Sequence, residues 1–174
     1  PTLALGIEYP GIVAITSWTY GTSDPYTTQF LEATVAHEVG HQWFYNLIGD
    51  DQLDDPWLDE SLTQFATLQY FRDVHGTQGY EGFRSSLEGR WAQVEFAKVP
   101  IGLPVDDYDG AEYGPIVYGR GPLFFVALKE EMGADAFDQF LRVYAETLAW
   151  GISTPETLQS LAEASCACDL DRIF

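Results

Sequence analysis

The chain has 174 residues, 46% of them hydrophobic, which is enough apolar surface to build the core of one globular domain. Its 27 acidic and 8 basic residues give a formal charge of -19, which would repel nucleic-acid phosphates and anionic membranes. Nucleic acid is therefore not an expected partner, and the scattered carboxylates favour a solvated acidic surface.

The first elements expected along the chain are two short strands and a helix. The segment "LALGIEYPGIVAITS" (3–17) alternates between apolar and other residues and is interrupted by Pro and Gly, which predicts two strands joined by a turn at 9–11. After the polar stretch "GTSDPYTT", apolar residues recur at spacings of three and four and predict a helix over about 28–47. Gly49 and the acidic segment after it would end this helix.

The rest of the chain reads as helical. Asp55 and Pro56 supply an N-cap and a proline at the first helical position, Gly76 provides a stop, and Thr154 caps the last helix before a proline. The predicted helices cover residues 56–75, 78–98, 116–132, 135–150 and 155–165. The expected fold class is α+β, with a small β segment followed by a mainly helical body in one domain, 1–174.

Neither the cysteines nor the chain ends indicate a compartment. Cys166 and Cys168 are one residue apart, a spacing that we expect to be too tight for a relaxed mutual disulfide and that lacks the C-x-x-C pattern of a zinc knuckle. No stretch approaches the roughly 18 apolar residues of a membrane span. The chain starts inside an apolar segment with neither an initiator methionine nor the charged start of a signal peptide, so we expect a fragment of a larger multidomain chain.

The segment "HEVGH" carries two of the three histidines, His37 and His41, on a predicted helix. Residues four apart lie on one helical face, so both imidazoles can point at one zinc ion. Glu38 lies about 100° around the helix from His37, beside the metal rather than on it. This H-E-x-x-H pattern is typical of sites where zinc lowers the pKa of a water molecule and the glutamate acts as general base.

A catalytic zinc site needs a third protein ligand and one open position. Glu60 follows His41 after eighteen intervening residues, at the start of the next predicted helix, where a helical hairpin would bring its carboxylate beside the histidines. The third histidine, His75, precedes Gly76 at a predicted helix end and is expected to interact with the helix dipole, with no catalytic part.

The segments "HEVGH" (37–41) and "WLDES" (57–61), separated as described, resemble the H-E-x-x-H-x18-E signature of the M1 zinc metallopeptidases, the gluzincins related to aminopeptidase N and leukotriene hydrolase. The resemblance covers nearly the whole chain and implies a thermolysin-like zincin catalytic domain. It implies one zinc ion per chain, held by His37, His41 and Glu60, with Glu38 as general base.

Two more segments carry the resemblance. "VYGRG" is similar to the family's Y-x-K-G segment and implies that Tyr118 stabilises the oxyanion. "GIEYPG" is similar to the family's G-x-M-E-N segment and implies that Glu8 binds a substrate's free amino group. Gly6 and Ile7, just before it, would offer backbone groups to an extended peptide.

The chain also departs from the family pattern. Ile7 and Tyr9 replace the Met and Asn around the glutamate, and Arg120 replaces a lysine. Thr67 stands where many members have a carboxylate that hydrogen-bonds a zinc histidine, so a lower zinc affinity is expected. The family's large N-terminal β domain and C-terminal helical domain are absent from this chain and are expected partners of it in the full-length protein.

The sequence therefore predicts a zinc-dependent aminopeptidase that hydrolyses peptides with a free N-terminus. Two alternatives remain open at this point. One is a zinc-binding interaction domain with weak catalysis or none, because fold does not fix function. The other is a non-peptide hydrolase, such as an epoxide hydrolase, that uses the same site.

Overall fold

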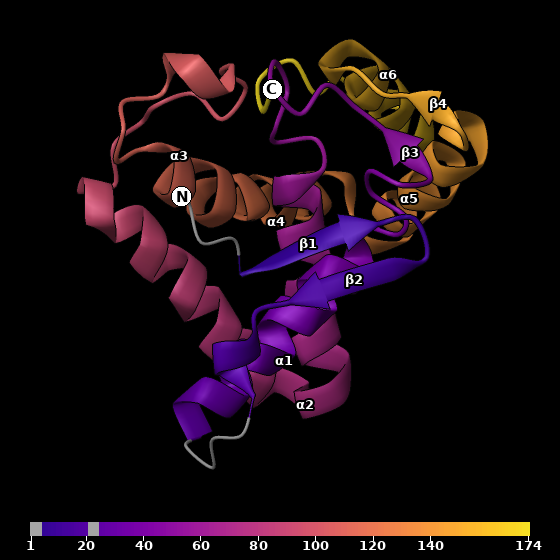
Figure 1. Ribbon diagram of the computed structural model, residues 1–174. Helices are drawn as coiled ribbons and strands as arrows, with labels where there is room; N and C mark the ends of the chain where they lie inside the picture. The colour runs from indigo at the N-terminus through magenta and orange to yellow at the C-terminus, as the bar shows by residue number, and fades with distance from the viewer. Residues whose placement is uncertain (1–4, 21–24) are drawn as a thin grey trace.

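The computed structural model describes residues 5–20 and 25–174 (Figure 1). It contains a small β segment and a mainly helical body, so the expected α+β class is confirmed. The strands are β1 (Gly6–Tyr9), β2 (Ile12–Ile15), β3 (Ile48–Gly49) and β4 (Gly151–Ile152). The α-helices are α1 (Pro25–Gly40), α2 (Glu60–Trp91), α3 (Tyr113–Pro115), α4 (Gly121–Met132), α5 (Ala134–Leu148) and α6 (Pro155–Cys166).

The β1–β2 hairpin confirms the predicted turn at residues 9–11. The strands pair antiparallel, with Gly6 opposite Ile15 and Tyr9 opposite Ile12, and Gly11 takes a positive φ of 79° that glycine adopts without strain. Residues of β1 alternate between half-buried and exposed, so Gly6 and Glu8 face inward.

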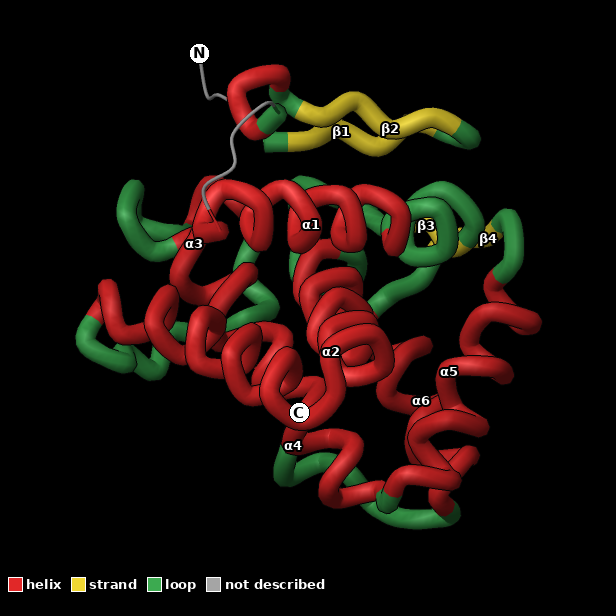
Figure 2. The backbone as a smooth tube through the Cα atoms, turned by 90° about the horizontal axis from the view of Figure 1, so that it is seen from below, coloured by secondary structure: helices red, strands yellow, loops and turns green. Residues whose placement is uncertain are grey.

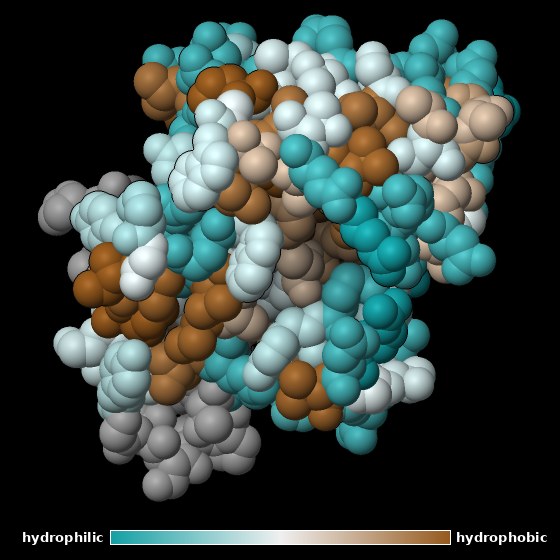
Figure 3. Space-filling model, turned by 90° about the vertical axis from the view of Figure 1, so that its right-hand side faces the viewer, coloured by the Kyte–Doolittle hydropathy of each residue, from teal (hydrophilic) through white to brown (hydrophobic). Residues whose placement is uncertain are grey.

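The hairpin and the helices form layers around α1. Figure 2 shows the hairpin lying along one side of α1, with α2 and the other helices on the opposite side. The outer face of the hairpin exposes Ile7, Tyr9 and Ile12, which are 42%, 52% and 66% exposed. Figure 3, a view of another side of the molecule, likewise shows brown hydrophobic patches among teal hydrophilic atoms.

Helix α1 is shorter than predicted and ends at Gly40 rather than near residue 47. Just after Gly40 a backbone hydrogen bond spans three residues instead of four, because the amide of Gln42 donates to the carbonyl of Val39. Asn46 then stops the helix, since its backbone nitrogen and its side-chain nitrogen both donate to the His41 carbonyl, at 2.9 and 3.1 Å. The segment after α1 turns into β3, which pairs in parallel with β4.

Helix α2 differs from the prediction at its start. It begins at Glu60, one turn after Pro56, and its cap is Asp59 rather than Asp55. Gly76 interrupts α2 as predicted, because its φ of 65° and ψ of −157° are non-helical and kink the chain there. The second half of α2 corresponds to the helix predicted over 78–98, but it ends at Trp91.

The helix predicted over 116–132 starts with a π-helical turn, Ile116–Arg120 (η4), before α4. Pro122 has no backbone N–H, so it cannot make the usual bond to the Tyr118 carbonyl. The amide of Gly121 donates to the Ile116 carbonyl five residues back instead, and Arg90 donates to the Tyr118 carbonyl at 3.4 Å. This turn changes the direction in which Tyr118 points.

The first half of α2 runs through the main core. Leu62, Phe65 and Leu68 are at most 2% exposed, and Phe125 of α4 and Phe137 of α5 pack against the same cluster. The ring centroids of Phe65 and Phe137 lie 5.3 Å apart. A helix buried on nearly every side is fixed by packing rather than by its own propensity.

The C-terminal segment contains one clear correction. Cys166 and Cys168 form a disulfide, although their spacing had been judged too tight. Ala167, between them, adopts the left-handed conformation that ends α6 and turns the chain back, so both sulfurs reach one another. The predicted cap of this helix is confirmed, since Thr154 accepts a hydrogen bond from the backbone of Thr157. Among the described residues, no helix has the length and apolar character needed to cross a bilayer.

Candidate active site

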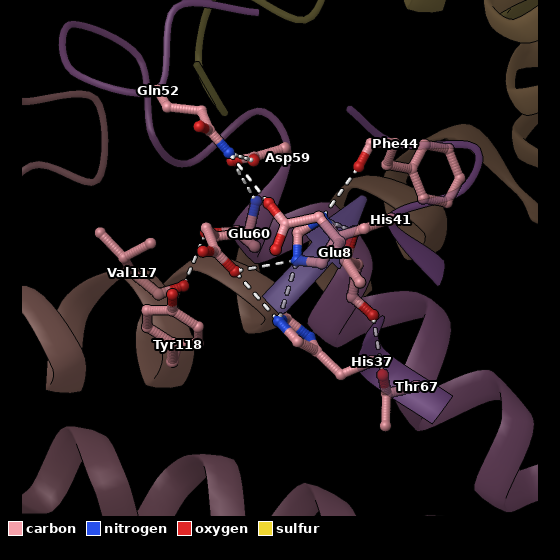
Figure 4. A network of polar contacts seen from close by, with 12 residues as sticks. Glu8, His37, His41, Phe44, Gln52, Asp59, Glu60, Thr67, Val117 and Tyr118 are labelled. Atoms are coloured by element: carbon pink, nitrogen blue, oxygen red, sulfur yellow. Dashed lines mark hydrogen bonds and ion pairs between the residues drawn. The ribbon is translucent and has the colours of Figure 1, made fainter. Parts of the chain in front are cut away.

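The three residues predicted to bind metal converge where α1 meets α2 (Figure 4). His37 lies in the last turn of α1, His41 directly follows that helix, and Glu60 is the first residue of α2. Nε2 of His37 lies 3.1 Å from Nε2 of His41 and 3.0 Å from Oε2 of Glu60. The third side of this triangle, from His41 to Glu60, measures 3.3 Å.

This triangle fits a tetrahedral zinc ion. Ligands about 2.0 to 2.1 Å from zinc are separated from each other by about 3.3 Å in a tetrahedron, close to the observed separations. Two imidazole nitrogens 3.1 Å apart and both directed at one carboxylate oxygen cannot all satisfy one another by hydrogen bonds alone. Two nitrogens and one oxygen are a ligand set that zinc favours.

The two imidazoles are oriented unequally. Nδ1 of His41 donates to the Phe44 carbonyl at 2.9 Å, so its Nε2 keeps the lone pair that a metal requires. Nδ1 of His37 is buried and has no hydrogen-bond partner among the described residues. The Thr67 hydroxyl, which the sequence suggested as a weak substitute for a carboxylate, donates to the Thr63 carbonyl at 2.9 Å instead.

The charge states of His37 and Glu60 suit metal binding. Burial lowers the pKa of His37, which favours its neutral, ligating form. Burial opposes charge on Glu60, but its hydrogen bonds with His37 and His41 outweigh this and hold the pKa of Glu60 well below its usual range. The bond to Glu60 also raises the pKa of His41 to about 9 against the effect of burial, so this histidine must release a proton when a metal binds.

Glu38 lines the cavity beside the three predicted ligands and is 5% exposed. Burial raises its pKa to about 7; His41 opposes this shift, and the charges of Glu8 and Glu60 add to it. The backbone of Gly6 packs directly on its side chain, so that any Cβ at residue 6 would overlap the Glu38 carboxylate. Glycine is thus required in β1 at the point where the strand approaches this carboxylate.

Tyr118 enters the same cavity from the π-helical turn. Its ring centroid lies 5.9 Å from that of His37, and burial, with the Glu60 charge adding, holds the pKa of Tyr118 well above its usual range. The turn is fastened to α2, because the hydroxyl of Ser61 donates to the Val117 carbonyl at 2.6 Å. Its two glycines, Gly119 and Gly121, sit against α2 so closely that neither has room for a Cβ.

Glu8 reaches the cavity from β1. One of its carboxylate oxygens lies within 4.8 Å of ligand atoms of Glu38 and His41. Gln52, in the segment between β3 and α2, donates to this carboxylate at 3.3 Å and to Asp59 at 2.9 Å. Gly6 and Ile7 also line the cavity, as expected.

The cavity measures about 650 Å³ and extends beyond the residues that the sequence indicated. Phe30, Ala33 and Thr34 of α1 and Phe83 of α2 line it as well. So does Gln64, one helical turn after Glu60, whose buried Oε1 has no hydrogen-bond partner among the described residues. Sequence reasoning missed Gln64 and Gln52; the spacing of four from Glu60 was a signal for the first, and no local signal marks the second.

His75 and one acidic group lie away from the site. His75 pairs with Glu32 across the α1–α2 contact at 2.7 Å, rather than with a helix terminus. A separate acidic group at the end of α6, Glu163, Asp169 and Asp171, offers only carboxylate oxygens and is mostly exposed. It lacks the nitrogen or sulfur ligands that zinc prefers.

A helical scaffold that gathers two histidines and a glutamate around one point, beside a buried glutamate and tyrosine, is typical of the metallopeptidase class. The profile of the peptidase family M1 domain matches residues 21–174. The chain belongs to peptidase family M1.

Known relatives agree with this assignment. The chain is 29% identical over 121 residues to leucine aminopeptidase 2 of Emericella nidulans, covering 65% of this chain and 19% of that protein. It is 29% identical over 158 residues to aminopeptidase N of Lactococcus lactis subsp. lactis, covering 79% of this chain and 17% of that protein. The chain thus spans less than a quarter of the length of these relatives.

The fold also matches a solved structure. The crystal structure of a mutant M1 zinc metallopeptidase from Deinococcus radiodurans, bound to a Tyr-Ser-Ala substrate, superposes with a TM-score of 0.74 at 21% identity. The match covers 99% of this chain and 36% of that one, so the described fold corresponds to one part of a larger protein.

Proposed function

We propose that the chain is the catalytic domain of a zinc-dependent aminopeptidase, part of a longer protein with further domains. The observation that carries the proposal is the cavity itself, where the triangle of His37, His41 and Glu60 meets Glu38, Tyr118 and Glu8. The names of the curated relatives support peptides as the substrate class.

His37, His41 and Glu60 would hold the zinc ion, one per chain, for which their spacing is suited. When bound, zinc supplies a Lewis acid that polarises the scissile carbonyl and lowers the pKa of the attacking water. Glu38, buried beside these ligands, accepts a proton from that water and delivers it to the leaving amine. The close contact with Gly6 keeps its carboxylate at the cavity wall.

Tyr118, which lines the same cavity, donates a hydrogen bond to the oxyanion of the tetrahedral intermediate. Glu8 accepts the substrate's α-ammonium, which places the first peptide bond near the proposed metal site, because a Glu8 oxygen lies within 4.8 Å of ligand atoms of Glu38 and His41. Within the described residues, β1 pairs only with β2, so its other edge is available for an extended substrate at Gly6 and Ile7.

The test uses the full-length protein, purified without added metal, with zinc measured by elemental analysis. Hydrolysis is compared for one peptide with a free amino terminus and for its N-acetylated form. We expect one zinc per chain and at least roughly tenfold slower cleavage of the acetylated peptide, since it leaves the half-buried Glu8 carboxylate without its ammonium partner.

Glu38→Gln should retain zinc and lose about 10²- to 10⁴-fold in kcat, the usual contribution of a general base. Glu32→Gln is the matched control on the same helix, because Glu32 contacts Tyr70 and His75 outside the cavity. Zinc without hydrolysis of any peptide would point to an interaction domain, and equal cleavage of both peptides would point to an endopeptidase or another hydrolase.

A further inference from the structure

Gln52 joins two carboxylates that are far apart in the sequence. Its side-chain nitrogen lies 3.3 Å from Oε1 of Glu8, on β1, and 2.9 Å from Oδ2 of Asp59, at the start of α2 (Figure 4). Because a primary amide has two N–H groups on one nitrogen, Gln52 can donate one hydrogen to each carboxylate.

Asp59 is the fixed end of this bridge. It is 1% exposed, and its second oxygen, Oδ1, accepts a hydrogen bond from the backbone nitrogen of Glu60. It therefore sits at the first turn of α2, next to a predicted metal ligand. Through Gln52, the Glu8 carboxylate is linked to the same end of α2 that carries Glu60.

Glu8 is the end of this bridge whose side chain has to be held in position. It lies on a two-stranded hairpin whose outer face is exposed, and a glutamate side chain has three rotatable torsions. Without a partner it would sample rotamers that point away from the cavity. The Gln52 contact uses Oε1, which leaves Oε2 as the oxygen that can accept a hydrogen bond from an ammonium group.

We propose that Gln52 is a positioning residue that holds the Glu8 carboxylate toward the cavity and thereby sets the preference for substrates with a free amino terminus. The proposal rests on the proposed function, because the role of Glu8 belongs to it. Two features are specific to the amide: it donates to both carboxylates, and it adds no charge between them. A carboxylate in its place would donate to neither and would repel both.

The experiment compares Gln52→Ala and Gln52→Glu with the parent protein, in the full-length zinc-bound form. kcat and KM are measured for a peptide with a free amino terminus and for its acetylated form. We expect KM for the free peptide to rise about tenfold in both variants, with kcat nearly unchanged. The kcat and KM of both variants for the acetylated peptide should stay near those of the parent, so the preference for the free peptide is lost.

The two substitutions separate hydrogen bonding from packing. Gln52→Glu keeps the shape of the side chain but removes its donors, so a purely structural role for Gln52 would leave this variant close to the parent. Should the alanine variant fail to fold, Gln52→Met keeps similar volume without a donor and serves in its place.

The chain supplies a matched control in Gln159 of α6. Its side-chain nitrogen also bridges two carboxylates, those of Glu163 at 3.3 Å and Asp171 at 2.9 Å, away from the cavity. Gln159→Ala should leave the ratio of free to acetylated cleavage unchanged. A similar loss of preference in this control would show a general effect of removing such bridges and would overturn the proposal.

The outcomes distinguish this proposal from the function on which it rests. If the parent prefers free peptides and both Gln52 variants keep that preference, Gln52 is not a positioning residue and the aminopeptidase stands. If the parent cleaves neither peptide, the proposed function fails. In that case, calorimetry measures the binding of leucine amide and N-acetyl-leucine amide to the parent and to Gln52→Glu, and the result tests the Gln52 bridge. An amine preference that is lost in Gln52→Glu supports the bridge, whereas equal binding of both probes by the parent overturns it.

Discussion

The β1–β2 hairpin and the first half of α2 line the same cavity but are held in place by different means. Leu62 and Leu68 of α2 are fully buried, whereas Ile7 and Ile12 of the hairpin are 42% and 66% exposed. Helix α2 is fixed by packing on several sides, and the hairpin depends on contacts with α1 and on a few polar bonds. Glu60 thus lies on the densely packed element, next to the two histidines at the end of α1, and the group proposed to select the substrate lies on the weakly held hairpin.

This difference predicts where substitutions act. Changes on the α1–α2 side should remove metal or catalysis, because those side chains are buried and have no alternative position. Changes in the hairpin or its polar contacts should alter KM and selectivity, or the position of Glu38, at a smaller cost.

The largest effect is expected from Glu60→Ala on the α2 side. Removing one of three ligands should lower zinc affinity by more than about 100-fold, the upper end of the loss seen when only a supporting residue is removed. Hydrolysis should fall in parallel. Elemental analysis and zinc titration measure the change, with Glu163→Ala as the control from the oxygen-only group. Unchanged zinc content in Glu60→Ala would remove this residue from the ligand set.

Tyr118→Phe should lower kcat by about 10²- to 10³-fold and leave KM close to the parent value, since its hydrogen bond forms in the transition state. Steady-state kinetics on a free peptide tests this. Tyr144→Phe is the control: it removes a buried hydroxyl that donates to Ser153 at 2.8 Å and does not line the cavity. That variant should lose about 1 kcal/mol of stability and keep its kcat. A rise in KM alone for Tyr118→Phe would make Tyr118 a binding residue.

Gly6→Ala tests the point where the hairpin meets the catalytic side. The added methyl group overlaps the Glu38 carboxylate, so Glu38 or the strand must move. We expect kcat to fall about tenfold or more, as a small misplacement of a catalytic group costs up to roughly 100-fold. Gly82→Ala, in the exposed second half of α2 with no atom near its Cβ, should gain about 0.5 to 1 kcal/mol instead. Parent-like kinetics in Gly6→Ala would mean that Glu38 is not held by this contact.

The smallest effect is expected from Gln42→Ala. Gln42 accepts from the backbone of Gly11 at 2.8 Å and donates to the Tyr9 carbonyl at 3.1 Å, which ties the hairpin turn to the end of α1. Because both bonds are exposed, their loss should cost about 1 kcal/mol and speed amide hydrogen exchange in the hairpin while α2 stays protected. Equal protection of the hairpin in parent and variant would show that other contacts hold it.

Local patterns in the sequence predicted the parts of the site that depend only on residues within about one helical turn or one β-turn of each other. The spacing of His37 and His41 places both on one helical face wherever that helix packs, and Pro10 and Gly11 define a turn without tertiary help. The spacing from His41 and the expected helical hairpin predicted Glu60, the family resemblance added Tyr118 and Glu8, and the structure gathers all three around the same cavity. Their roles remain the prediction that the variants above test.

Tertiary structure decided what depends on contacts between distant segments. Helix α1 stops at Gly40, just before the His41 carbonyl that accepts both hydrogen bonds from Asn46, and η4 forms where Pro122 removes a donor against a closely packed α2. Gln52 meets Glu8 across 44 residues, and no local periodicity encodes such a pair. Sequence spacing fixes neighbours within about one helical turn, because the backbone geometry there is regular. Longer-range hydrogen bonds form only after packing has brought their elements together, so they can be identified only in the folded structure.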